Sequence, residues 1–378
     1  MGGARMFAEN DAANFAYNPA SMTKIQGEKA KISVAYIAPH GKYEAKGGYY
    51  DEAGRNRVNP AFAPGTYYVK QLNDKEWIGM GAYARFGNMC QFERGSIPAT
   101  SNACAKMNGV SLGMNYAKKL DSKWSASLGA EVNYVGLRYD KTLPAAIGGG
   151  QMQVNGETYA LGWNAAANYE FDEKNEIGVV YRSKVKHSME ADLDMHGGYA
   201  LLASGGLATD LYGDAYGCVT LPESVMIGYN HKFNDRTRME LNGTWTRWSR
   251  FSALDMVLTV AGQSDVQPDY KGWSDGWRYA IGLEHKLSDK YTLLAGIAHD
   301  ERAIPDDGAD FMVPTGERDT YTLGIQYHDK KQTIAASFGY MDVGDLNMTK
   351  AEPHGGYATA KMYDSYTKIV VLSYQYNF

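Results

Sequence analysis

The residues that could carry out chemistry in this chain are few and dispersed. Its eight histidines show no spacing typical of metal ligands, and they lie at positions 40, 187, 196, 231, 285, 299, 328 and 354. We expect His187 and His285 to lie on apolar rows near strand ends, in structural roles. The segment Asp306-Asp307-Gly308-Ala309-Asp310 could bind a cation, although a solvated loop is the simpler interpretation. The residues therefore predict no enzyme, no metal centre and no cofactor.

The composition excludes several classes of protein. Three cysteines in 378 residues exclude a disulfide-dense scaffold, and a net charge of −5 without a basic block disfavours a nucleic-acid partner. An aromatic content of 12% argues against disorder. No segment approaches the ~18–20 consecutive apolar residues of a membrane-spanning helix. The mean hydropathy of −0.44 suggests a soluble protein, but an alternating pattern would hide apolar residues from such an average.

The last segment of the chain, Lys368 to Phe378, shows that alternation. Val370, Leu372, Tyr374, Tyr376 and Phe378 share one face of a strand with period two, and the residues between them are mostly polar. Two interpretations stay open for this segment alone. It is the edge strand of an ordinary β domain, or it is the closing strand of an outer-membrane barrel that ends in Phe.

The same alternation recurs along the chain and predicts about fourteen strands. We place them near residues 28–45, 62–71, 77–87, 109–117, 124–139, 157–170, 177–189, 219–233, 237–250, 277–287, 291–299, 319–328, 333–341 and 365–378. Many begin or end in Tyr or Trp, as do strands with aromatic girdles at the two membrane interfaces. An even number near fourteen lies inside the range of roughly 8–26 strands found in single-chain barrels.

The predicted connections are asymmetric. Short polar turns are expected at 119–123, 171–176, 234–236, 287–290 and 328–331, whereas long segments rich in Gly, Pro and Ala cover 144–156, 196–217, 261–276 and 302–318. Short turns at one end and long loops at the other are typical of a meander barrel with periplasmic turns and extracellular loops. The pattern predicts an all-β protein, a monomeric transmembrane antiparallel β-barrel in the bacterial outer membrane.

Residues 4–22 do not follow the strand pattern. Taken alone, this Ala-rich segment reads as a frayed terminal helix with a turn at Asn18-Pro19. It also resembles the N-terminal hatch of the FadL/TodX family of outer-membrane transporters for long-chain fatty acids and other hydrophobic compounds. The resemblance rests on Glu9 to Ala12 followed by Asn18 to Met22. It continues in order through 59–68, 77–87, 181–186, 221–224, 246–254, 299–307 and the terminal Phe378.

The resemblance implies a fourteen-stranded barrel, residues 28–378, plugged in its lumen by a hatch, residues 1–27. Asn18, Pro19 and Ala20 would hold the turn of the hatch. In the family, movement of the hatch and a kink in the third strand open a route sideways into the bilayer. Gly79, Gly81 and Gly87 are the natural places for such a bend, and packing of these glycines against the hatch is an equal alternative.

The resemblance also implies the function, which is passive uptake of hydrophobic compounds such as long-chain fatty acids or aromatic hydrocarbons. The ligand would be captured at the extracellular loops and then bound in an apolar pocket of the barrel. Candidate ligand contacts are Trp248, Phe251, Trp273 and Trp277, for which a place in the outer aromatic girdle is the alternative. The partners would be this ligand and the lipopolysaccharide membrane. A porin or adhesin and a lipid-modifying barrel enzyme remain alternative functions.

The cysteines and the N-terminus give two further expectations. Cys90 and Cys104 fall in one predicted extracellular loop, where either a disulfide or two free thiols would be compatible with an oxidising compartment, and Cys218 has no obvious partner. Met1 to Arg5 lacks the charged and apolar regions of a signal peptide, which fits either a cytoplasmic protein or a mature or trimmed chain that carries an added Met.

Overall fold

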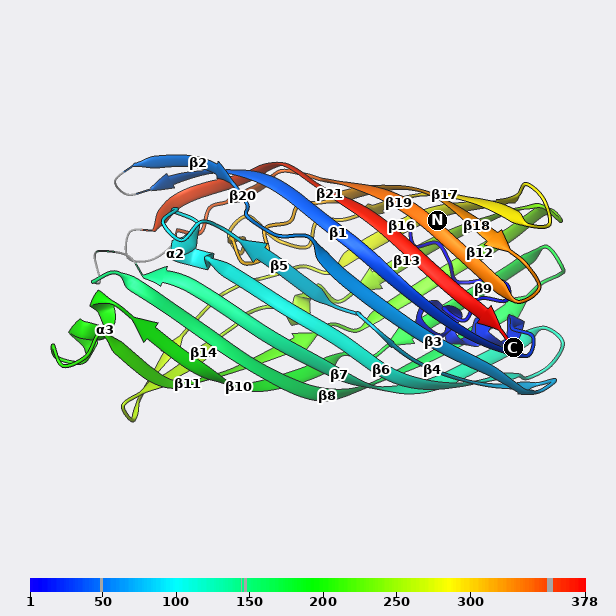
Figure 1. Cartoon of the computed structure of the whole chain (residues 1–378), viewed down its shortest axis with the longest axis horizontal. Helices are drawn as coiled ribbons and strands as arrows, with labels where there is room; N and C mark the ends of the chain where they lie inside the picture. Colours follow the sequence, from blue (N-terminus) through cyan, green and yellow to red (C-terminus); the bar gives the residue numbers. More distant parts are fainter. Residues whose placement is uncertain (48–49, 144, 146–147, 352–355) are drawn as a thin grey trace.

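The computed structural model describes residues 1–47, 50–143, 145, 148–351 and 356–378, and its sheet closes into a barrel (Figure 1). The wall consists of β1 (Glu28–Gly47), β3 (Ala61–Asn73), β4 (Glu76–Tyr83), β6 (Cys104–Lys119), β7 (Trp124–Leu143), β8 (Gly150–Glu170), β9 (Asn175–Arg182), β12 (Ser224–Asn234), β13 (Thr237–Thr246), β16 (Gly276–Lys286), β17 (Tyr291–Asp300), β18 (Arg318–His328), β19 (Gln332–Val343) and β21 (Tyr357–Asn377). Each strand pairs antiparallel with the next, and β21 pairs with β1, which closes a ring of fourteen.

The remaining elements lie mostly at the end of the barrel that carries the long loops. Three strands continue the wall beyond interruptions, namely β5 (Gly87–Gln91), β10 (Val185–His196) and β11 (Asp210–Leu221). The others are β2 (Asp51–Arg55), β14 (Met256–Val260), β15 (Gln263–Gln267), β20 (Leu346–Met348), α2 (Ala99–Asn102), α3 (Gly198–Ala203) and the 3₁₀ turn η3 (Trp248–Arg250). Among the described residues, no helix is both long and apolar enough to span a membrane.

The predicted all-β barrel of about fourteen strands is confirmed, and every predicted strand is present. Several strands are longer than predicted at the long-loop end. The predicted loops 144–156 and 196–217 were too long, because β8 begins at Gly150 and β11 at Asp210. In the β8 extension the alternation is inverted: Met152 and Val154 are buried on the inner face and Gln151 and Gln153 lie on the other, so the outward apolar row on which the prediction depended is missing. Residues 144, 146 and 147 of the first loop, and His354, lie outside the described residues.

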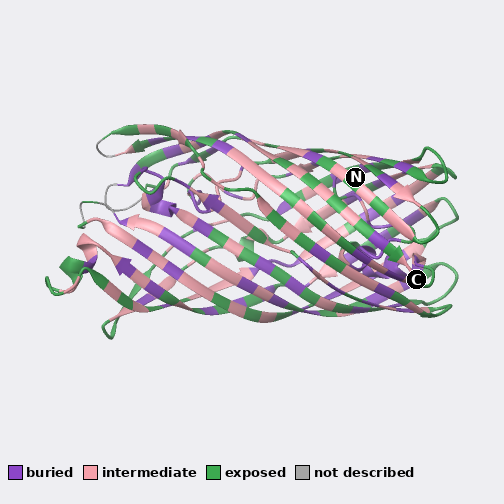
Figure 2. Ribbon diagram, in the orientation of Figure 1, coloured by how far each residue is buried: buried purple, intermediate pink, exposed green. Residues whose placement is uncertain are grey.

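The two faces of the wall reverse the arrangement of a soluble protein. Large apolar side chains point outward, as at Leu161 and Leu323, which are 78% and 68% exposed. Polar side chains point inward and are buried, as at Glu131 and Glu240, which are 2% and 0% exposed. Buried and exposed positions therefore alternate along the strands (Figure 2). A hydrocarbon-facing exterior around a polar interior is the arrangement expected of an outer-membrane barrel.

The short turns share one local design. Asp121, Asp172, Asn234 and Asp329 each use a side-chain oxygen to accept hydrogen bonds from backbone N–H groups two and three residues later. Such turns need few residues and expose polar groups to water. They confirm the predicted asymmetry between short turns and long loops.

The residues before β1 fold into the lumen near the short-turn end, where both chain termini lie (Figure 1). They form the short helix α1 (Asn14–Tyr17) and the 3₁₀ helix η1 (Pro19–Lys24). Their apolar side chains, including Phe7, Phe15 and Met22, are almost completely buried. The Asn18 side chain accepts a hydrogen bond from the Ala20 N–H and donates one to Asn168 on β8, at 2.7 Å. Asn18, Pro19 and Ala20 thus form a turn fixed to the wall.

Polar groups of the lumen hold the backbone of this segment. Glu240 accepts hydrogen bonds from the N–H groups of Met6 and Phe7, and Gln375 bonds both to the Ala12 N–H and to the Asn10 carbonyl. Asp11 forms ion pairs with Arg5 and with Lys31 of β1. Burial acts to raise the pKa of Asp11, but the charges of Lys31 and Arg5 outweigh it and hold that pKa well below its ordinary value. Residues 1–27 therefore supply hydrogen-bond and ion-pair partners to several of the buried polar groups of the barrel.

Glycines in the third strand make room for this segment. A side chain at Gly79 would approach Met22 and Phe15, and one at Gly81 would approach Phe15 and the Thr66 carbonyl oxygen, the latter within 2.6 Å. Gly87 differs, because a Cβ there would meet no atom closer than the Met107 carbonyl at 3.7 Å. Gly79 and Gly81 therefore provide packing space, whereas Gly87 starts β5 just after an interruption of the strand.

We expect the substitution Gly81→Val to lower the free energy of unfolding by about 1–3 kcal/mol, because overpacking against the Thr66 carbonyl and the Phe15 ring cannot relax easily. The matched change Gly87→Val has open space and should change that free energy by less than about 0.5 kcal/mol. Urea unfolding in lipid vesicles, followed by tryptophan fluorescence, measures both. Equal effects of the two substitutions would contradict the packing role of Gly81.

Candidate functional site

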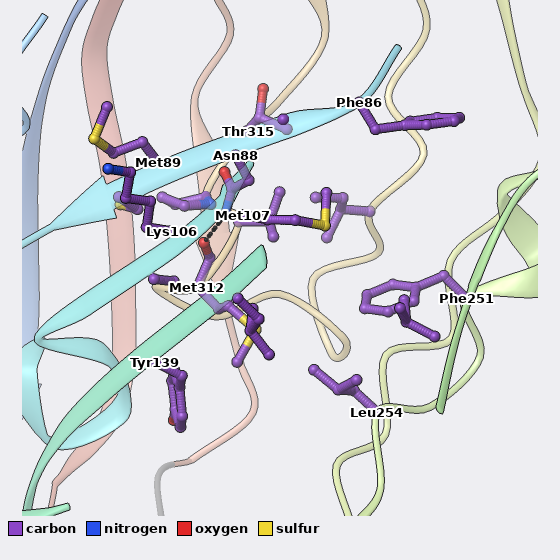
Figure 3. Close-up of a pocket in the computed structure, with 18 of the residues that line it drawn as sticks. Phe86, Asn88, Met89, Lys106, Met107, Tyr139, Phe251, Leu254, Met312 and Thr315 are labelled. Carbon is purple, nitrogen blue, oxygen red and sulfur yellow. Dashed lines mark hydrogen bonds between the residues drawn. The ribbon is translucent and has the colours of Figure 1, made fainter. Parts of the chain in front are cut away.

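A cavity of about 500 Å³ lies inside the barrel, between the N-terminal segment and the long loops. Wall strands supply apolar residues such as Val135 and Met189, and the loops supply others such as Leu254 and Met312 (Figure 3). The charged residues Arg85, Lys106, Glu301 and Arg318 and several polar residues also line the cavity, but its surface is mostly apolar. Its size and lining are typical of a site for a drug-sized apolar ligand.

Three of the four aromatic residues predicted as ligand contacts lie together at the loop side of the cavity. The Trp273 ring centroid is 5.2 Å from that of Trp248 and 4.8 Å from that of Phe251, and Phe86 contacts Trp248 edge-on. All four rings line the cavity. Trp277 is placed elsewhere: it is 40% exposed on the outer wall and stacks on Tyr279. The structure therefore groups Trp248, Phe251 and Trp273 and separates Trp277 from them.

The wall beside the cavity is interrupted in the third strand. Residues 84–86 separate β4 from β5, and the ladder between β3 and β4 ends at the pair Gly65 and Tyr83. Residues 61–64 of β3 pair with β1 on one side and, among the described strands, with none on the other. The Arg57 N–H closes the opening at its far end by a 2.7 Å hydrogen bond to the Gln91 carbonyl. We call this interruption the wall gap, formed by residues 61–64 and 84–91.

The cavity reaches the wall gap. Arg85, Phe86, Gly87, Asn88 and Met89 all line it, and Figure 3 shows Phe86, Asn88 and Met89 around the space. The Asn88 side chain donates a 2.9 Å hydrogen bond to the Met312 carbonyl, which ties β5 to the loop above. On the outer rim, the exposed Phe62 ring contacts Tyr36. An apolar cavity thus approaches the hydrocarbon side of the wall at this point.

A buried lysine joins the loops that cover the cavity. Lys271, 2% exposed, forms ion pairs with Asp310 and with Asp269, and Lys350 pairs with Asp269 at 2.8 Å. Burial acts to lower the pKa of Lys271, but Asp310 and Asp269 outweigh it and raise that pKa above its ordinary value. The segment 306–310 is therefore not a solvated loop tip as expected, because Asp310 pairs with Lys271 and Asp306 with Arg302.

The alternative of a disulfide between Cys90 and Cys104 is contradicted. Both residues are free thiols, and they lie on the paired strands β5 and β6. Cys90 faces Ala105 and Gln91 faces Cys104, so the register is offset by one residue. Because neighbouring positions on a strand point to opposite faces, the two thiols point to opposite sides of the sheet. Cys218 is also a free thiol and lines the cavity.

Other groups agree only in part with what the sequence suggested. His187 lies near the start of β10 on a buried apolar row with Val185 and Met189, as expected, but neither of its ring nitrogens has a hydrogen-bond partner among the described residues. Sequence reasoning also missed Gly272-Trp273-Ser274-Asp275-Gly276, which has the spacing of a nucleophile motif. This segment leads directly into β16, whose first residue is Gly276, and does not form the required strand-to-helix turn. Lys271 and the inward charges Arg85 and Glu131 were missed too, although ionisable residues within predicted spans were a usable signal.

Replacement of Lys271 tests whether its ion pairs hold together the loops that cover the cavity. We expect Lys271→Met to lower the free energy of opening the loops by about 3–5 kcal/mol, because it leaves Asp310 without its cation in a half-buried place. Lys350→Met is the matched control and should cost less than about 1 kcal/mol, since Lys271 still pairs with Asp269. Limited proteolysis within residues 261–275 and 302–318 measures the difference. Equal resistance of both variants would contradict this role of Lys271.

Comparisons with known proteins extend to nearly the whole chain. The family model described as outer membrane protein transport protein (OMPP1/FadL/TodX) matches residues 1–378. A long-chain fatty acid transport protein of Escherichia coli O6:H1 is 23% identical over 92% of this chain and 85% of its own length. A 47 kDa outer membrane protein of Pasteurella multocida is 26% identical over 94% of this chain and 87% of its own length.

Solved structures show the same fold. A FadL homologue of Pseudomonas aeruginosa superimposes with a TM-score of 0.88 at 19% identity, covering 99% of this chain and 96% of that one. The toluene transporter TodX of P. putida gives 0.76 at 16% identity, covering 97% and 94%. With the family model matching from the first residue to the last, the chain belongs to the OMPP1/FadL/TodX family of outer-membrane transport proteins.

Proposed function

We propose that this chain takes up hydrophobic compounds passively and releases them sideways into the outer membrane. As a member of its family it is an outer-membrane transport protein of a Gram-negative bacterium and not an enzyme, as predicted. The observation that carries the proposal is the apolar cavity, which reaches the wall gap while residues 1–27 fill the lumen below it. A hydrophobic ligand in this cavity would have the apolar bilayer beside it, beyond the wall gap. Beneath it would lie the polar lumen, which residues 1–27 fill.

The route has three parts. Trp248, Phe251 and Trp273 receive the ligand from the long-loop side, where the apolar rings replace its contacts with water. The cavity then holds the ligand, and the wall gap is its exit past Phe62. The hatch and the third strand move to widen that exit, with Gly87 at the point of bending. The concentration difference of the ligand drives the transfer, and a single closed barrel acts as the transporting unit.

The ligand is a long-chain fatty acid or an aromatic hydrocarbon. Both classes appear among the relatives, one of which is called a long-chain fatty acid transport protein and another a toluene transporter. A cavity of about 500 Å³ can hold either kind of molecule. The cavity would therefore bind the apolar part that both kinds of ligand share.

Substitution of the cavity aromatics tests ligand contact. We expect Trp273→Ala to weaken binding of a fluorescent fatty acid such as parinaric acid about tenfold or more, because one large apolar surface is lost from the site. Trp277→Ala is the matched control and should leave affinity unchanged, since that ring faces the outside of the wall. Fluorescence titration of the purified protein measures both constants. A large effect of Trp277→Ala with none of Trp273→Ala would place the ligand outside the cavity.

Deletion of residues 1–22 distinguishes a plugged transporter from an open porin. The full chain should exclude sugars in a liposome swelling assay, because the hatch fills the lumen. The shortened chain should admit them, since Glu240, Gln375 and Asn168 then face water. A shift in gel mobility on heating confirms that each barrel is folded. Rapid swelling with the full chain would support the porin alternative, and no swelling with the shortened barrel would refute the plugging role.

A further inference from the structure

Three interruptions of the barrel wall occur at the same level of the lumen. The third strand breaks at residues 84–86, the seventh at Ser183-Lys184 between β9 and β10, and the eighth at Pro222-Glu223 between β11 and β12. Pro222 has no N–H to contribute to a ladder. Each break frees backbone groups that the regular hydrogen-bond pattern would otherwise pair. Where these groups are buried, as at Ser183, they need partners within the protein.

One side chain, that of Arg85, connects all three breaks. Arg85 lies in the first break, and its Nη2 donates to the Ser183 carbonyl at 3.0 Å and to the Pro222 carbonyl at 3.4 Å. Its Nη1 pairs with Glu131 of β7 at 2.6 Å. The Arg85 and Glu131 side chains are only 7% and 1% exposed. The planar guanidinium is suited to this task, since it presents several donors in fixed directions.

The same cluster continues to the hatch. Glu131 also accepts a 2.9 Å hydrogen bond from the Tyr83 hydroxyl, and Arg182 donates to that hydroxyl at 2.8 Å. Arg182 also donates to the carbonyl of Ala16, in α1 of the hatch. The Phe15 ring packs edge-on against Tyr83 at 6.1 Å. An unbroken chain of contacts therefore runs from the hatch through Glu131 to Arg85.

The position of Arg85 joins this chain to the transport path. Arg85 lines the cavity, and its guanidinium lies 5.1 Å from the ring of Phe86, which belongs to the wall gap. If a ligand or a movement of the hatch displaced the guanidinium, the Ser183 and Pro222 carbonyls would lose their hydrogen-bond donor at the same time. Because buried carbonyls without partners are costly, those strands would have to rearrange together.

We propose that Arg85 is a latch that holds the three wall breaks closed and couples them to the hatch. This inference rests on the proposed function, in which the third strand and the hatch move to let the ligand leave. It adds Arg85 as a positioning residue, and it adds two further segments of the wall that move, Ser183-Lys184 and Pro222-Glu223. These lie 98 and 137 residues away from Arg85 in the sequence.

Hydrogen exchange of the purified full chain in detergent, without ligand, tests the latch. We expect Arg85→Met to raise amide exchange about tenfold in three separate peptides, around residues 84–86, 183–184 and 223–224, as for the loss of hydrogen bonds from a charged group. Arg85→Lys keeps the ion pair with Glu131 but cannot reach both carbonyls, so it should give a smaller rise in the same peptides. Arg138→Met is the matched control, because it also removes an arginine that pairs with a buried carboxylate, that of Asp140, but Arg138 is exposed and lies in the regular strand β7.

The outcomes separate a latch from a local structural role. A rise confined to residues 84–86, or no rise at the two distant breaks, would overturn the proposal. Arg85→Lys decides the matter if Arg85→Met does not fold, as judged by gel mobility on heating. Uptake of a fatty acid by the unmodified chain is measured separately. Absence of that uptake would refute the proposed function, whereas the exchange pattern would still decide whether Arg85 couples the three breaks.

Discussion

Inside a hydrocarbon layer every backbone N–H and C=O must find its partner within the protein, and this requirement shapes the whole molecule. The ring of fourteen strands meets it by pairing β1 with β21, from Lys29 opposite Asn377 to the long-loop end. Closure fixes the register, and the register assigns alternate residues to lipid and lumen. The lumen rows are polar, so they need hydrogen-bond partners in turn. Residues 1–27 supply many of these through their own backbone, as at Glu240 and Gln375.

The functional features lie where this backbone pairing is relaxed. At the wall gap, residues 61–64 lose the ladder on one side, and beyond it the Arg57 and Gln91 backbones resume contact. Side chains near the gap bond to other parts of the protein, because Arg85 donates to the Ser183 carbonyl and Asn88 donates to the Met312 carbonyl. A few side-chain hydrogen bonds are easier to exchange than a continuous ladder, which is consistent with the opening that we propose. The cavity, its aromatic rings and the wall gap lie in one region, with regularly paired strands on either side.

Much of the fold was predictable from the sequence because one physical rule, outward apolar and inward polar, repeats in most of the wall strands. Val370, Leu372 and Tyr374 indicated the closing strand correctly. The motif around Asn18 predicted a hatch through its resemblance, and the structure places the residues before β1 inside the lumen. The site was less predictable because it depends on contacts between distant segments. Lys271 meets Asp310, and Arg85 meets Ser183, only after the barrel closes. Trp248, Phe251, Trp273 and Trp277 looked alike in sequence, yet strand register places only Trp277 on the outer wall. A one-residue offset likewise separates Cys90 from Cys104.

We propose that the ligand leaves through the side of the barrel and not along its axis. The decisive measurement is photolabelling in intact outer membranes with a long-chain fatty acid that carries a diazirine near its tail. We expect labelled residues around the cavity, as at Phe251 and Met312, and along the wall gap at 61–64 and 84–91. Labelling of lumen residues near the short turns, such as Glu176 and Arg238, with none in the wall gap would contradict this proposal.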